Sequence, residues 1–111
     1  MFVVAYQLDA WALLGDPSRR SIIERLSAGP CTVSDLAGGM TISRPAVSQH
    51  LKVLREAGVV HDDQQGRNRI YSIDAQRLAR YRRQLDQFWS DALGNLAPED
   101  KREREADERG A

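Results

Sequence analysis

The sequence predicts a mainly α-helical fold with a small β-hairpin, a winged helix-turn-helix of about five helices and a two-stranded wing. Two short amphipathic segments, residues 32–38 and 43–57, flank a glycine-containing turn, which is the pattern of a helix-turn-helix. Two β-branched and aromatic runs with a polar stretch between them then predict a hairpin. A long segment after residue 74, with apolar residues three and four apart, predicts the closing helix.

Length and composition allow a single domain. The chain has 111 residues, of which 41% are apolar and 29% charged, an ordinary balance for a globular protein. No window approaches the roughly 18 apolar residues of a membrane span, and the apolar start, residues 1–6, lacks the basic region of a secretory signal. We expect a cytoplasmic protein with no membrane partner, folded over residues 1–97, with a charged, disordered tail at 98–111.

Gly15 separates the first two helices. Asp16 followed by Pro17 is a helix start signal, because Asp caps free amides and Pro is tolerated at the first helical position. Gly29 and Pro30 end the second helix. We expect its inward face to be Ile22, Ile23 and Leu26. The apolar stripe of the first helix is expected at Leu8, Trp11, Ala12 and Leu14.

The helix-turn-helix segments carry their own start and stop signals. Thr32 with Asp35 resembles a capping box and opens the first of them, and the glycines at 38–39 stop it. Ser43 caps the second, and Gly58 is placed as its left-handed terminator. The apolar set of this second helix falls at helical spacing: Val47, Leu51, Leu54 and Ala57.

The wing and the last helix complete the domain. Val59 and Val60 form one run of the hairpin and residues 69–73 the other, with "HDDQQGRN" as a polar tip that contains Gly66. Asp74 caps the last helix. Its apolar residues are Leu78, Tyr81, Leu85, Phe88 and Ala92, with Trp89, Leu93 and Leu96 alongside.

The helix that Ser43 opens leaves a small, polar face exposed. In a helix-turn-helix, the second helix lies in the major groove with its N-terminal half at the base edges. Arg can bind guanine with two hydrogen bonds, Gln can bind adenine, and Ser allows close approach, whereas Lys one turn further on meets phosphate. A solvated face has a similar composition; the turn and the hairpin favour DNA binding. The face consists of Arg44, Pro45, Ser48, Gln49 and Lys52.

Cationic residues outside this helix are candidates for contacts with the DNA backbone. Arg67, Asn68 and Arg69 lie at or beside the hairpin tip, where they can enter a minor groove or bind its phosphates. A charged tip also discourages edge pairing, which is the structural alternative. Arg19 and Arg20 stand in the first turn of the second helix, against the helix dipole, which favours a functional reason for them.

The net charge limits how nucleic acid could bind. It is zero over the whole chain, and residues 98–111 hold six acids against four bases, which leaves a small excess of twelve bases over ten acids in residues 1–97. Binding must therefore depend on placed residues rather than on bulk charge.

Three stretches, "LLGDPSRRSIIERL", "SRPAVSQHLKVLREAGVV" and "GRNRIYSI", occur in an order that resembles the ArsR/SmtB family of winged-helix repressors. The resemblance covers roughly residues 8–96. It implies a homodimer that binds a palindromic operator in double-stranded DNA and responds to an effector. By position it implies that Arg44, Pro45, Ser48 and Gln49 read bases and that Arg67 and Arg69 act in the wing. His50 resembles the family's structural histidine.

The metal signatures of that family are missing. Its thiolate motif falls on Thr32 and Ser34, and Cys31, the single cysteine, stands one position out of register. Soft-metal binding needs thiolates. The family's second site would need His at 76 and 87, or at 77 and 88, where Gln, Arg and Phe stand. His61 beside Asp62 and Asp63 could bind a divalent ion weakly, but these residues are better explained as a solvated strand end. We expect no metal and no cofactor.

The last helix carries more apolar surface than a small winged core can cover. A two-fold interface of the first and last helices is the expected cover. Aromatic residues of the last helix could instead line a pocket for an unknown small-molecule effector. The expected interface is Leu8, Trp11, Leu14, Leu78, Tyr81, Leu85, Phe88, Trp89 and Ala92.

Two functions remain after these observations. The first is a sequence-specific transcriptional repressor, and the second is a winged-helix module that uses the same face for a protein partner, which the zero net charge keeps open. An enzyme is discounted, because no nucleotide-binding glycine loop, nucleophile with its base or ligand cluster appears. Asp62 and Asp63 are adjacent, so on a strand they face opposite sides and cannot act as an acid and base pair.

Overall fold

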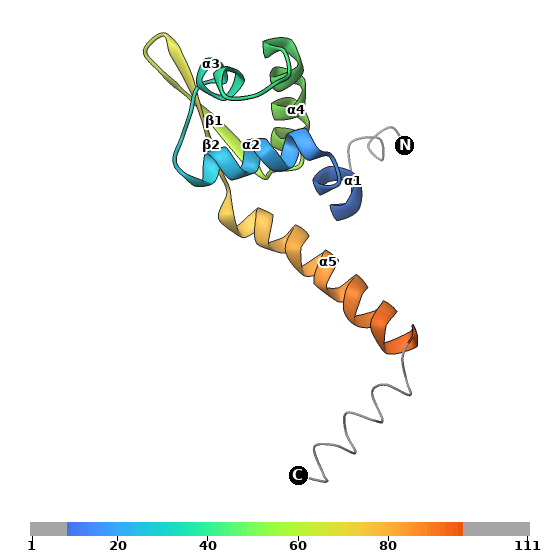
Figure 1. Ribbon diagram of the computed structural model, residues 1–111. Helices are drawn as coiled ribbons and strands as arrows, with labels where there is room; N and C mark the ends of the chain where they lie inside the picture. Colours follow the sequence, from blue (N-terminus) through green and yellow to red (C-terminus); the bar gives the residue numbers. More distant parts are fainter. Residues whose placement is uncertain (1–8, 97–111) are drawn as a thin grey trace, which may run out of the picture.

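A computed structural model describes residues 9–96, which form five helices and one two-stranded antiparallel sheet. This confirms the predicted fold class. The hairpin and helices α2 to α4 make up the body of the molecule, and α5 runs out from it past α1 (Figure 1). In chain order the elements are α1 Ala10–Leu14, α2 Pro17–Ser27, α3 Val33–Gly38, α4 Arg44–Glu56, β1 Val60–Gln65, β2 Asn68–Ile73 and α5 Ala75–Leu96. Leu8 and the tail 98–111 lie outside the described residues.

Aspartate side chains begin the first two helices. Asp9 accepts from the Ala12 amide at 2.8 Å, and Asp16 accepts from the amides of Ser18 at 2.8 Å and Arg19 at 3.1 Å. The Asp16 cap with Pro17 after it is as predicted. The expected apolar stripe of α1 does not include the residues that α1 buries in its own chain, because Ala10 and Leu13 are buried while Trp11 is 45% exposed. The short helix turns about one residue away from the face that spacing alone suggested.

The helix-turn-helix is built around a closed apolar core. Thr32 Oγ1 accepts from the Asp35 amide at 3.1 Å and Ser43 Oγ from the Ala46 amide at 3.2 Å, so both predicted caps form. Gly58 has φ +78°, which confirms the left-handed terminator of α4. The core combines α4 with residues of every other part of the body: Leu13, Ile22, Leu26, Leu36, Val47, Leu51, Leu54, Ala57, Val59 and Val60.

The hairpin is longer than the sequence suggested. Its register pairs Val60 with Ile73 at the base and Gln65 with Asn68 at the end, so most of the expected polar tip belongs to the strands. Only Gly66 and Arg67 form the turn, and Gly66 has the positive φ, +64°, that a two-residue turn requires. The extent of β1 was hidden because its residues after Val60 are all polar or charged, a composition that is depleted in strands.

Helix α5 begins at a cap and leaves the body. Asp74 Oδ1 accepts from the Arg77 amide at 3.0 Å, as predicted. Leu78 and Tyr81 in its first half pack against the core, but no residue of α5 is fully buried. The second half extends past α1 (Figure 1). Its large apolar side chains are exposed: Phe88, Trp89, Leu93 and Leu96. Among the described residues no helix is long and apolar enough to cross a membrane.

The central place of α4 in the core predicts an asymmetric response to two neighbouring substitutions. Leu51 is 1% exposed, so Leu51→Ala should lower the free energy of unfolding by about 2–5 kcal/mol. Lys52 is exposed, so Lys52→Ala should change it by less than about 0.5 kcal/mol. Denaturant unfolding followed by circular dichroism measures both. Equal losses in the two variants would show that the core is not packed as described.

Candidate nucleic-acid interface

One face of α4 is polar, exposed and free of the core. Val47, Leu51 and Leu54 are each at most 1% exposed and point inward. On the other side, Ser43 at the cap, the four residues expected at the bases and the lysine expected at phosphate are all exposed: Arg44, Pro45, Ser48, Gln49 and Lys52. The structure therefore brings these side chains together on the N-terminal two-thirds of one helix, as the sequence predicted.

The long helix α5 does not cover this face. Its polar contacts with α4 reach only the far end, where Arg77 Nη1 donates to the Ala57 carbonyl at 3.1 Å and Tyr81 Oη lies 3.5 Å from the same oxygen. Within the described residues, neither Arg44 nor Lys52 has a carboxylate within ion-pair distance. A surface with two uncompensated cations and no covering element suits a polyanion.

Of the predicted wing residues, Arg69 has an ion-pair partner in the protein, whereas Arg67 does not have one among the described residues. Arg67 is exposed in the turn, and Asn68 is exposed at the start of β2. Arg69 instead binds Asp62 of β1 within the hairpin, and Arg55 at the end of α4 binds the same carboxylate oxygen at 3.2 Å. The charge of Arg69 is thus partly compensated inside the protein, whereas that of Arg67 is not.

Arg19 and Arg20 have internal partners that the sequence did not reveal. Arg19 Nε donates to the Leu13 carbonyl and Arg19 Nη2 to the Ala12 carbonyl, both at 2.8 Å. Arg20 Nη1 donates to the carbonyls of Leu14 at 2.9 Å and Gly15 at 3.1 Å. Cations at the C-terminal end of a helix satisfy its last carbonyls and its dipole. This capping of α1 explains both arginines without DNA, so their expected backbone contacts stay predictions.

The two histidines and the cysteine lie in separate places. His50 Nδ1 is 3.3 Å from Arg19 Nη1, and its Nε2 is 4.0 Å from Asp16. His61 Nε2 lies 2.9 Å from Asp74 Oδ2 at the start of α5. Cys31 bridges to Tyr71 through two backbone hydrogen bonds of 3.1 and 2.8 Å. Over residues 9–96 no group of three His, Cys, Asp or Glu side chains is placed to hold a metal ion.

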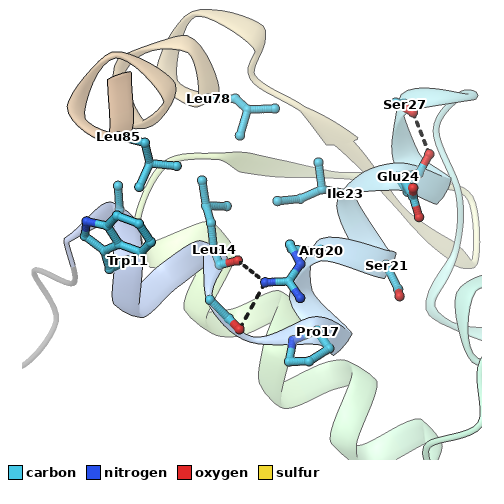
Figure 2. Close-up of a pocket in the computed structure, with 12 residues that line it drawn as sticks. Trp11, Leu14, Pro17, Arg20, Ser21, Ile23, Glu24, Ser27, Leu78 and Leu85 are labelled. Atoms are coloured by element: carbon cyan, nitrogen blue, oxygen red, sulfur yellow. Dashed lines mark hydrogen bonds between the residues drawn. The ribbon is translucent and has the colours of Figure 1, made fainter. Parts of the chain in front are cut away.

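A groove opens between α1, α2 and α5. It has a volume of about 770 Å³, and Leu14, Leu78 and Leu85 point into it beside Trp11 (Figure 2). Arg20 lies at its edge with its guanidinium on the carbonyls of α1 (Figure 2). Next to this groove, Trp11, Phe88 and Trp89 form an edge-to-face cluster with ring centroids 5.2–5.8 Å apart. The alternative that aromatic residues of the last helix line a pocket does not apply to this groove, because α5 contributes Leu78 and Leu85 to it and the aromatic residue among its lining is Trp11 of α1.

Sequence reasoning missed the ion pairs that join elements. The sequence did not indicate that Asp62 pairs with Arg69 of β2 or with Arg55 of α4. One signal was available: Asp62 is two residues after the buried Val60, so it shares the inward face of β1. A carboxylate on an inward face needs a cationic partner. No local pattern indicates which cation provides it.

A winged body with an exposed polar helix face and an arginine at the tip of its hairpin defines a winged helix-turn-helix DNA-binding protein. The comparisons with known proteins narrow the class. The family model "Bacterial regulatory protein, arsR family" matches residues 16–62. The HTH-type transcriptional regulator Rv2034 of Mycobacterium tuberculosis is 50% identical over 88 residues, which are 79% of this chain and 82% of that protein. The chain belongs to the ArsR family of transcriptional regulators.

Two further matches agree with this family assignment. The arsenical resistance operon repressor of Escherichia coli is 33% identical over 89 residues, which are 79% of this chain and 74% of that one. Among solved structures, the crystal structure of a "possible transcriptional regulator for arsenical resistance" superimposes with a TM-score of 0.73 at 43% identity, over 82% of this chain and 95% of that one. The resemblance to ArsR/SmtB proteins inferred from the motifs is confirmed.

Three aspartates have their pKa below the ordinary value. Burial raises the pKa of Asp16, but the Arg19 amide, the His50 ring and the Ser18 amide together lower it by more. The hydrogen bond from Arg69 lowers the pKa of Asp62, and Arg55 adds to the effect. The Arg77 amide lowers the pKa of Asp74, and His61 adds to the effect. Each lowered pKa marks a carboxylate whose ionised form the folded state favours.

These shifts predict a loss of stability in acid. A carboxyl group whose folded pKa lies below its unfolded value, about 3.9, stabilises the protein above that pH and loses the contribution as pH falls through the folded pKa. The melting temperature should therefore decrease as the pH is lowered below about 4. Asp16→Asn keeps a capping oxygen but does not titrate, so its melting temperature should fall less steeply with pH than that of the wild type. Thermal melts from pH 6 to pH 2.5 measure both slopes, and identical slopes would contradict the prediction.

Proposed function

We propose that the protein is a homodimeric repressor that binds a palindromic operator through α4 and the wing and that is not regulated by a metal. The observation that carries the proposal is the division of α4 between a buried apolar side and an open polar side. The name of the Escherichia coli relative, a repressor, supports the direction of regulation. Such a regulator acts where the bacterial chromosome is, so a cytoplasmic location belongs to the same proposal.

The side chains of α4 divide into base readers and backbone contacts. Arg44 and Gln49 can each form two hydrogen bonds with a base edge, to guanine and adenine respectively, and Ser48 with Pro45 lets the helix approach closely. Lys52, one turn further on, binds phosphate, as does the N-terminal end of α4 behind Ser43. In the wing, Arg67 and Asn68 are the candidates for the adjacent groove, because both are exposed and, unlike Arg69, neither has an ion-pair partner among the described residues.

The exposed apolar surface of α1 and α5 is the proposed dimer interface. Trp11, Phe88 and Trp89 are 45%, 48% and 51% exposed, and Leu93 is 60% exposed, so the surface is uncovered in one chain. A contiguous patch of this kind marks an interaction site. Leu85 and Ala92 continue it, whereas Leu14, Leu78 and Tyr81 also pack against the core of their own chain. Leu14, Leu78 and Leu85 line the adjoining groove. A second copy would fill the groove between α1, α2 and α5, and the two recognition helices would meet half-sites about one helical turn apart.

The chemistry of the chain supports regulation without a metal. The whole sequence has one cysteine, and Thr32 and Ser34 stand where the family's thiolate motif falls. One thiolate in a chain does not make a site for soft ions such as arsenite or Zn²⁺. Addition of such ions should therefore leave operator affinity unchanged.

The protein-partner alternative is separated by one experiment. The purified protein selects bound duplexes from a random pool, and the affinity for the selected duplex is then measured at several salt concentrations. Phosphate contacts require that log affinity falls as log salt rises. Selection of a two-fold symmetric sequence with such a slope supports the repressor, whereas no enrichment and a flat response favour a protein partner.

The division of labour on α4 predicts two different DNA-binding defects. Gln49→Ala should cost about 1–3 kcal/mol on the selected duplex and relax the preference at one base position. Lys52→Ala should weaken all sequences about equally and reduce the salt slope by about one. Competition titrations with single-base variants of the duplex measure both. Equal losses on selected and random DNA for both variants would contradict the assignment of the groove.

The aromatic cluster predicts the oligomeric state. The wild-type protein should sediment as a dimer at micromolar concentration, and Phe88→Ala with Trp89→Ala together should shift it to the monomer, because buried aromatic residues carry most of an interface's free energy. Gln87→Ala, on the same helix but bound to Asp91 of its own chain, is the control that keeps the dimer. A wild-type protein that sediments as a monomer at this concentration would contradict the proposed interface.

A further inference from the structure

The base of the wing contains an ion-pair cluster that the DNA-binding surface described above does not use. It consists of Asp62 on β1, Arg69 on β2 and Arg55 in the last turn of α4. Strand alternation places Asp62 on the same face of the hairpin as Val60, which is in the core. Asp62 thus stands at the point where this face passes from the core to the projecting wing.

The geometry makes Asp62 the centre of the cluster. Its Oδ2 atom accepts from Arg69 Nη1, and it accepts from Arg55 Nη1 at 3.2 Å. The Asp62 side chain is 13% exposed, while those of Arg55 and Arg69 are 45% and 51% exposed. One sheltered carboxylate therefore holds two guanidinium groups that would otherwise reach into solvent. Charge-assisted hydrogen bonds of this type are shorter and stronger than neutral ones.

The wing needs an anchor of this kind. A two-stranded hairpin is marginally stable alone. Toward the tip, Tyr71 is the last described residue of this hairpin that packs against the apolar core, and it lies opposite Asp62 and is joined to Cys31 by two backbone hydrogen bonds. Of the described interactions of the projecting part, the pair between Asp62 and Arg55 is the side-chain contact that ties it to α4. The contact on Arg69 ties β2 to the same point.

We propose that Asp62 is a positioning residue for DNA recognition, which fixes the wing against the end of α4 and withholds Arg55 and Arg69 from phosphates. The proposal rests on the DNA-binding function proposed above. With Asp62 in place, the wing presents Arg67 at a defined distance from the base-reading residues of α4. Without it, the hairpin swings and two freed cations bind any backbone, so affinity for random DNA rises while discrimination falls.

The chain provides a matched control in the next residue. Asp63 lies on the opposite face of β1, is exposed and has no ion-pair partner within the described residues. Asp62→Asn and Asp63→Asn remove the same charge one residue apart, so the general electrostatic gain for DNA is equal in both. Any difference between them therefore measures the pairing. Asp62→Glu keeps a carboxylate and serves as the rescue variant, and circular dichroism melts verify that each variant folds.

Two measurements are made on each full-length variant. Titrations of the selected operator and of a random duplex at several salt concentrations give the ratio of affinities and the salt slope. Relaxation of the backbone amides of Gly66 and Arg67, as the ¹H–¹⁵N nuclear Overhauser effect, reports fast motion of the wing tip without DNA.

For Asp62→Asn we expect the affinity ratio to fall roughly three- to tenfold, within the range known for mutations in a coupled contact network. The slope on random DNA should steepen by about one to two, one unit for each freed arginine that finds a phosphate. The tip amides should become more mobile. Asp63→Asn should keep the wild-type ratio and tip relaxation, and Asp62→Glu should restore part of the discrimination.

An unchanged ratio or an unchanged tip in Asp62→Asn, compared with Asp63→Asn, overturns the proposal. If the wild-type protein shows no salt-dependent DNA binding, the proposed function fails instead, and the amide relaxation still decides whether Asp62 fixes the wing.

Discussion

Burial of one side of α4 determines the geometry of everything around it. Val47, Leu51 and Leu54 are shared by α2, α3 and the base of the hairpin through one core, so the rotation of α4 about its own axis is fixed from three directions. Packed interiors resist such rotation, because each side chain would leave a void. The polar residues between these three positions are therefore held outward by the hydrophobic effect rather than by contacts of their own.

A protein of zero net charge can present a basic surface only by using its acids elsewhere. Three aspartates illustrate how this is done here. Asp16 caps α2, Asp74 caps α5, and Asp62 takes up two guanidinium groups at the base of the wing. Each of these carboxylates is bound by a group of its own chain. Arg44 and Lys52 on α4, in contrast, have no carboxylate partner among the described residues. Local charge placement thus matters more than the total.

Local chemistry was readable from the sequence, and distant partners were not. The caps at Asp16, Ser43 and Asp74 and the glycine after α4 follow from signals within four residues, and all are confirmed. The polar face of α4 follows from helical spacing. The inward turn of Leu13, the extent of the hairpin and the partners of Arg19 depend on groups far along the chain. A five-residue helix has too few positions for periodicity to define its face.

The side chain of Arg19 contacts both α1 and α4. Its guanidinium binds the last carbonyls of α1 and lies 3.3 Å from the ring of His50 in the middle of α4. Helix α1 belongs to the surface where two copies would meet, and α4 to the surface that would face the operator. If two copies meet through α1, as proposed, a shift of α1 relative to α2 would break these hydrogen bonds or move the His50 ring with it, and would thereby link the proposed dimer surface to α4.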